Sequence, residues 1–125
     1  MLPKNEKTFS INVMGDDTGE RFAGEFTCVC VPFISMRNKI ARDEIRECGD
    51  LGNITTDLFL RSRYLVNVQS RLTSWPDWWQ GMGHGARLLD DNVLKEVYEK
   101  CIEAEVEWRA SVKAKADTTP PTAQA

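Results

Sequence analysis

The first 31 residues contain two runs in which apolar and polar positions alternate. In the first run Phe9, Ile11 and Val13 alternate with polar residues, the period of a half-buried strand. In the second run the residues that share the apolar face are Phe22, Phe26, Cys28 and Cys30. The segment MGDDTGE between the runs is rich in turn-forming residues. The pattern therefore predicts an N-terminal β-hairpin, which must pack on another element because an isolated hairpin is only marginally stable.

Three later segments repeat their apolar residues at helical spacing. The first runs from Ser35, a good N-cap, to about Cys48 and is strongly charged. The second runs from Thr55 or Thr56 to about Ser74. The third runs from about 92 to 115 after an Asp90 or Asp91 cap, and its apolar stripe comprises Leu94, Val97, Cys101, Ala104 and Trp108. We expect the second and third helices to pair antiparallel.

Between the second and third helices lies SWPDWWQGMGHGARLLDD, which brings together three tryptophans and three alternate glycines. Pro76 prevents the second helix from passing Trp75. We expect a loop ordered by its tryptophans. Its GMGHG run predicts a turn that needs positive φ or close backbone approach.

Together these elements predict an α+β fold, with an N-terminal β-hairpin packed on a three-helix, mainly α-helical domain. The chain of 125 residues is long enough for one domain with its own core. We expect that domain to span residues 1–115. Residues 116–125, rich in Pro, Thr and Ala, are expected to form a disordered tail.

Composition and charge narrow the function classes. The chain is 42% hydrophobic and 28% charged, with a net charge of −3, which gives no electrostatic reason to expect nucleic-acid binding. No run approaches the ~20 apolar residues of a membrane span, and the N-terminus lacks the apolar core of a signal peptide. We therefore expect a soluble protein that stays in the cytoplasm where it is made.

The residues that carry chemistry do not form a recognisable catalytic or metal motif. The four cysteines lack paired zinc-ligand spacing, so free thiols are expected and no metal. GMGHG lacks the Gly-Lys-Ser/Thr ending of a phosphate loop, so no cofactor is expected. A catalytic role for His84 would need a nucleophile and a carboxylate, such as Cys101 and Asp90, which the spacing does not require. We expect binding and not catalysis, with a small nucleotide-binding or hydrolytic enzyme using GMGHG as an alternative.

The tryptophans are candidates for protein binding. Trp is enriched at interface hot spots, but a Trp cluster also serves as a core plug, and both interpretations stay open. The hypothetical protein-binding set combines this cluster with the apolar edge of the last helix: Trp75, Trp78, Trp79, Val97, Cys101 and Trp108. The acidic run near Glu103 is interpreted as a solvated face.

The order of these features resembles the tail assembly chaperones of long-tailed, siphovirus-like bacteriophages. The resemblance covers about residues 8 to 112. It rests on GEFT in the hairpin, RDEIR in the first helix, WPDWWQ, LLDDNVLKEVY and EVEWR. Within these, Pro76, Trp78 and Trp79 match an aromatic P-x-W-W motif, and Asp90, Asn92 and Val93 match a D-x-N-V motif that opens the last helix.

The resemblance implies a protein that binds the tape measure protein and helps to recruit tail tube subunits around it. It also implies location in the host cell cytoplasm, without retention in the virion, and we expect a homo-oligomer. Such chaperones bind amphipathic helices in exposed apolar grooves. A virion structural subunit of the tail or connector is the alternative within phage proteins. The cysteines and GMGHG depart from the family pattern.

Overall fold

The computed structural model describes residues 4–32, 34–48 and 56–117. Its N-terminal part is the predicted hairpin, made of β1 (Glu6–Met14) and β2 (Arg21–Val29). The two strands pair antiparallel in unbroken register from Glu6↔Val29 to Met14↔Arg21. The hairpin and the α+β class are thus confirmed.

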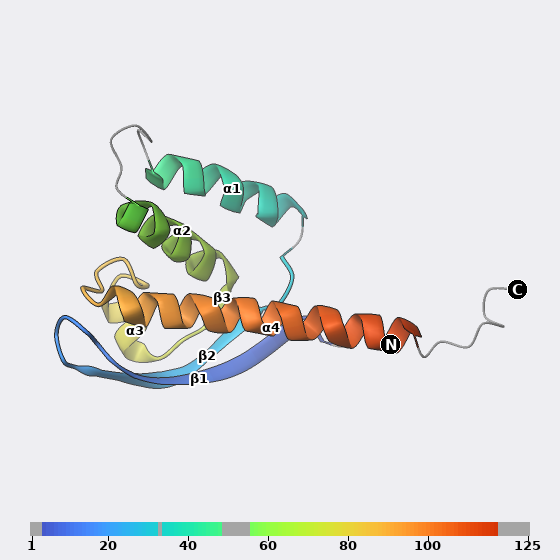
Figure 1. The fold of residues 1–125 in the computed structure, drawn as a ribbon, viewed down its shortest axis with the longest axis horizontal. Helices are drawn as coiled ribbons and strands as arrows, with labels where there is room; N and C mark the ends of the chain where they lie inside the picture. The colour runs from blue at the N-terminus through green and yellow to red at the C-terminus, as the bar shows by residue number, and fades with distance from the viewer. Residues whose placement is uncertain (1–3, 33, 49–55, 118–125) are drawn as a thin grey trace, which may run out of the picture.

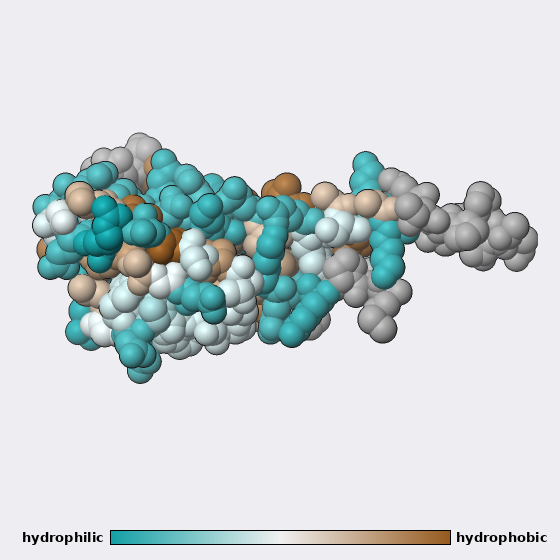
Figure 2. Space-filling view, turned by 90° about the horizontal axis from the view of Figure 1, so that it is seen from below, coloured by the Kyte–Doolittle hydropathy of each residue, from teal (hydrophilic) through white to brown (hydrophobic). Residues whose placement is uncertain are grey.

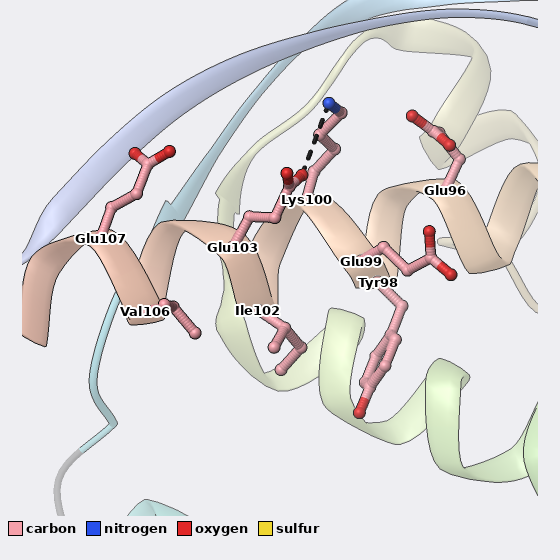
Figure 3. A pocket seen from close by; sticks show the side chains of 8 residues that line it. All are labelled: Glu96, Tyr98, Glu99, Lys100, Ile102, Glu103, Val106 and Glu107. Carbon is pink, nitrogen blue, oxygen red and sulfur yellow. Dashed lines mark ion pairs between the residues drawn. The ribbon is translucent and has the colours of Figure 1, made fainter.

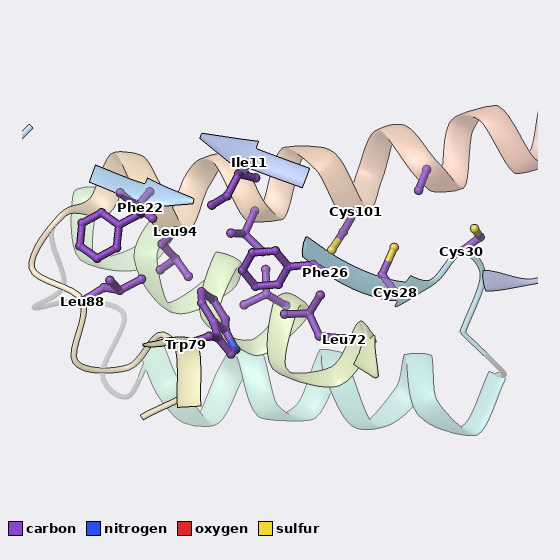
Figure 4. Packing of buried hydrophobic residues seen from close by; sticks show 14 residues of the cluster. Ile11, Phe22, Phe26, Cys28, Cys30, Leu72, Trp79, Leu88, Leu94 and Cys101 are labelled. Atoms are coloured by element: carbon purple, nitrogen blue, oxygen red, sulfur yellow. The ribbon is translucent and has the colours of Figure 1, made fainter. Parts of the chain in front are cut away.

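The predicted apolar face of β2 is the floor of the core. Phe22, Phe26, Cys28 and Cys30 are all buried on it, and Ile11 of β1 lies beside them. Figure 4 shows these side chains between the strands and the helices, with Trp79, Leu88 and Leu94 completing the cluster. Burial of these apolar side chains is the main force holding the hairpin to the helices, at about 25 cal/mol for each Å² removed from water.

The helices lie in layers on one face of the sheet (Figure 1). They are α1 (Ile34–Cys48), α2 (Thr56–Arg71), the short α3 (Asp77–Gly81) and the long α4 (Asp91–Asp117). Helix α4 lies directly on β1 and β2, α2 packs on α4, and α1 packs on α2. The core therefore sits where α4, α2 and the sheet meet.

The segment after α2 differs from the prediction. Helix α2 ends at Arg71 and not near Ser74, because residues 72–74 form a third strand, β3 (Leu72–Ser74), beside β2. Leu72 is buried there opposite Cys28. The expected tryptophan loop also contains α3, which starts after Pro76 as proline at a helix N-terminus allows. Hydrogen bonds to β2, which no local pattern reveals, decide the end of α2.

Helices α2 and α4 run parallel, so the prediction of antiparallel packing is wrong. Cross-helix contacts join Arg61 to Asp91, Tyr64 to Tyr98 and Arg71 to Glu105, with both residue numbers rising together. Parallel packing is possible because β3, α3 and the turn after them carry the chain back to the start of α2 (Figure 1).

The boundary of the domain also shifts slightly. Helix α4 continues to Asp117, two residues into the expected tail. The remainder of that tail, 118–125, lies outside the described residues.

Candidate protein-binding face of the last helix

Helix α4 carries apolar residues on two faces. The inner face is the predicted stripe, of which Leu94, Val97, Cys101 and Ala104 are buried and Trp108 is half-buried, with Val93 buried beside it. The second row consists of Tyr98, Ile102 and Val106, spaced four residues apart, so they lie above one another on the side of α4 where Tyr98 packs on α2. Figure 3 shows all three pointing to the same side of α4. We call this row the outer stripe.

The outer stripe becomes more exposed toward the C-terminus of α4. The ring of Tyr98 packs on Tyr64 of α2, with centroids 4.6 Å apart. Ile102 is half-buried, and Val106 is 61% exposed. An exposed valine is ordinary by itself, but here it continues an apolar row that already begins in the core.

A shallow groove of about 690 Å³ follows the outer stripe. The charged residues among its described lining are Glu96, Glu99, Lys100, Glu103 and Glu107. Figure 3 shows Glu103 and Glu107 on the side of α4 toward the strands, away from Ile102 and Val106. The groove thus combines an apolar floor with a mainly acidic border.

The glutamates of this border form ion pairs that are open to solvent. Lys100 pairs with Glu103 at 3.5 Å, and Lys95 pairs with Glu99 at 3.7 Å. Glu107 pairs with Lys7 of β1. Exposed pairs of this kind contribute about 0–1 kcal/mol, so a cationic partner can displace them at small cost.

The three clustered tryptophans have different environments. Trp79 is 1% exposed and meets Phe26 edge-on at 5.3 Å, so it is a core residue. Trp78 is half-buried and donates from Nε1 to the carbonyl oxygen of Ala23 at 2.8 Å. Trp75 is also half-buried, with its ring edge-on to His84 at 5.0 Å. The structure therefore leaves Trp75 and Trp78, but not Trp79, partly available to a partner.

The three proposed binding residues on α4 also differ in how far they are buried. Val97 and Cys101 are fully buried against β2 and α2, whereas Trp108 is half-buried at the edge of the core. A partner could reach Val97 or Cys101 only if α4 left the sheet. Binding through Trp75, Trp78 and Trp108 stays a prediction.

The GMGHG run forms a tight turn for the reasons that the sequence indicated. Gly83, His84 and Gly85 all have positive φ, at 62°, 54° and 94°. A Cβ on Gly85 would stand 2.7 Å from the Trp79 ring, so this position combines positive φ with close approach. The turn thus seats the ring of Trp79 in the core.

Asp90 has a role that the sequence analysis did not anticipate. Its carboxylate is 1% exposed and accepts hydrogen bonds from Asp17 N, Thr18 N and Thr18 Oγ1, at 2.7, 2.9 and 2.6 Å. It therefore binds the hairpin turn instead of capping α4. The Thr18 hydroxyl, with the two backbone N–H groups, lowers the pKa of Asp90 despite its burial.

Asn92 completes this clamp on the hairpin turn. Its side chain accepts from Asp16 N at 3.0 Å and donates to the carbonyl oxygen of Met14 at 2.9 Å. The residues of the D-x-N-V motif thus have a structural function: Asp90 and Asn92 hold the turn, and Val93 is buried in the core.

The three cysteines whose side chains the structure describes are buried. Cys28, Cys30 and Cys101 are free thiols with no exposed surface. The hydrogen bond with Cys28, reinforced by burial, raises the pKa of Cys101 far above its ordinary value. Burial likewise raises the pKa of Cys30. Reactive cysteines are partly exposed and have lowered pKa values. Cys30 and Cys101 are instead buried and have raised pKa values.

Within residues 4–32, 34–48 and 56–117, no group of three or more His, Cys, Asp or Glu side chains is placed to hold a metal ion. The same residues contain no helix with the length and apolarity needed to cross a bilayer.

Tyr98, Ile102 and Val106 were not among the candidate binding residues predicted from the sequence. Their spacing of four was a visible signal, since it forms a second apolar row beside the core stripe. The surrounding glutamates directed the interpretation toward a solvated face instead. Whether neighbouring helices bury such a row depends on where α2 ends and where α1 packs. The sequence of α4 alone cannot predict either position.

Comparisons of this chain with protein-family models, with curated proteins and with solved structures find no match.

Proposed function

We propose that this protein is a tail assembly chaperone-like binding protein whose outer stripe on α4 receives an amphipathic helix. The observation that carries the proposal is the continuous apolar row from Tyr98 to Val106, bordered by glutamates and leading out of the core. A row of this spacing matches the i, i+4 anchors of a helix laid in a groove.

The charges around the row indicate which helices would fit. Four glutamates and one lysine line the groove, so a client helix with Lys or Arg beside its apolar face gains attraction. The resemblance to phage tail assembly chaperones names the tape measure protein as the client, with tail tube subunits recruited afterwards. A binding function of this kind requires no cofactor and no catalytic residue.

The first test is co-expression with the tape measure protein of the same phage, followed by size-exclusion chromatography with mass determination. We expect a soluble complex of defined stoichiometry. If the client still aggregates while this protein alone forms a large uniform ring or tube, the virion structural subunit replaces the chaperone.

A variant pair locates the binding face. Val106→Lys removes an apolar contact and places a positive charge beside the expected basic client, so we expect at least a tenfold loss of affinity, or about 1.4 kcal/mol. Leu89→Lys is the matched control, because Leu89 is 72% exposed and lies outside the groove. Equal client affinity in the two variants would move the site away from α4.

A further inference from the structure

The outermost strand of the sheet has a long open edge. The strand order is β1-β2-β3, and β1 has nine residues whereas β3 has three. No other described segment pairs with the outer side of β1. Figure 2 views the molecule from the strand side, where a pale area of intermediate hydropathy extends beside the charged residues.

The hydrogen-bond pattern identifies which residues of β1 direct their backbone N–H and C=O groups to this open edge. Gly15 N donates to Glu20 O and Cys30 N donates to Asn5 O, at the two ends of the ladder. In an antiparallel pair every second residue bonds to its partner, so the odd-numbered residues of β1 face β2. The even-numbered residues, Glu6 through Met14, therefore direct their N–H and C=O groups outward, and among them the carbonyl oxygen of Met14 already accepts from Asn92 Nδ2.

This edge lacks the features that usually prevent strands from pairing. Natural edge strands are protected by charges, proline or bulges. The part of β1 from Thr8 to Met14 has no charged residue and no proline, and its register with β2 is unbroken. The only charges in the strand, Glu6 and Lys7, lie at its first two positions.

We infer that β1 pairs antiparallel with β1 of a second copy, with Ser10 at the two-fold axis, to form one continuous sheet. This register opposes Thr8 to Asn12 of the second copy, and Glu6 to its Met14. The charged ends of the strands then lie far apart, whereas parallel pairing would place Glu6 beside Glu6. An isologous interface requires this kind of self-complementarity.

Pairing of the two β1 strands also determines where the two α4 helices lie in the dimer. A two-fold axis perpendicular to the sheet keeps both α4 helices on the same side of it, since α4 covers one face of β1 and β2. A groove of about 170 Å³ also lies between β1 and α4, lined in part by Lys7, Phe9 and Glu103. Strand pairing would extend the wall of this groove.

Ser10→Pro tests the inference directly. Proline removes the outward N–H at the centre of the proposed interface, and it leaves the β1–β2 hydrogen bonds intact because residue 10 does not bond to β2. Sedimentation equilibrium of the full chain should give a dimer, with at least a tenfold higher dissociation constant for Ser10→Pro. Ser10→Thr, which keeps the N–H, should retain the dimer.

Ser10→Lys provides a second variant in case the proline disturbs the hairpin. It places two positive charges opposite each other at the axis and should also give a monomer with an unchanged circular dichroism spectrum.

A wild-type monomer at every concentration, or an oligomer that both variants leave intact, would overturn the inference. Protection of the Thr8, Ser10 and Asn12 amides only in the client complex would assign the edge to the client, also overturning it. Client affinity of the monomeric variants is measured separately, so failure of strand pairing is distinguishable from failure of the chaperone proposal.

Discussion

At the scale of the residue, single side chains decide how the tryptophan segment folds. Trp79 fills the core because Gly85 has no Cβ and tolerates φ of 94°, so the backbone can lie against the ring. His84, also at positive φ, occupies the adjacent position of the same turn and packs on Trp75. The glycine at position 85 is therefore accounted for by the packing of the Trp79 ring.

Gly85→Ala should destabilise the protein strongly. The added Cβ would meet the Trp79 ring and would force alanine into a left-handed conformation, and together these effects cost about 2–4 kcal/mol. Thermal unfolding checks the change. Gly81→Ala is the control in the same segment, because φ there is not positive and nothing lies within 4 Å of the added Cβ. Equal melting temperatures for the two variants would contradict this account.

At the scale of the element, the hairpin and α4 are joined at both ends. Asp90 and Asn92 hold the hairpin turn to the start of α4. Toward the other end, Arg71 of α2 is 8% exposed, pairs with Glu105 of α4 at 2.8 Å, and reaches the carbonyl oxygen of Cys30. These two polar connections fix the position of α4, which sets the direction of the outer stripe.

The Asp90 clamp predicts a specific acid dependence. Because the pKa of Asp90 is lowered in the folded protein, its stabilising effect is complete above the ordinary value of 3.8. That effect is lost as the pH falls through the lower folded value. Asp90→Asn should therefore lower the melting temperature at pH 7 by roughly 5 °C or more, and the difference from wild type should shrink below about pH 4.

The control for this experiment is Asp16→Asn in the same hairpin turn, whose side chain is exposed. We expect its melting temperature to stay close to that of the wild type at both pH values. A difference between Asp90→Asn and wild type that is constant from pH 7 to pH 3 would show that the carboxylate charge is not responsible.

At the scale of the whole molecule, one core connects all the layers. The buried cluster takes residues from β1, β2, α2, β3, α3 and α4, including Ile11, Phe26, Val68 and Trp79. Among the described elements, α1 alone contributes no residue to this cluster. It packs on α2 and has a buried residue of its own, Ile40. Every described element therefore either contributes to this core or packs on an element that does.

We therefore predict a single cooperative unfolding transition. Tryptophan fluorescence reports the surroundings of Trp75, Trp78 and Trp79 together with those of Trp108 on α4, and circular dichroism at 222 nm reports the helices. The two denaturation curves should share one midpoint. A helical signal that persists after the fluorescence change would instead mean that α1 and α2 form a separate unit.

The sequence by itself determined the properties that depend on neighbouring residues. Alternation in 9–13 and 22–30 identified the hairpin and its buried face, and helical spacing located three helices to within a few residues. The glycine turn was also predicted, because positive φ and close approach are local demands. Local patterns suffice here because side-chain direction repeats every two residues in a strand and every 3.6 in a helix.

Only the tertiary structure decided which of these residues remain accessible. Of the six proposed binding residues, Trp79, Val97 and Cys101 are buried and the other three, Trp75, Trp78 and Trp108, are half-buried. The row of Tyr98, Ile102 and Val106 along α4 was not among the six. The parallel direction of α2 and α4 and the bond from Asp90 to Thr18 were likewise not foreseeable. The physical reason is distance along the chain, since partners 72 residues apart meet only when the whole core has assembled.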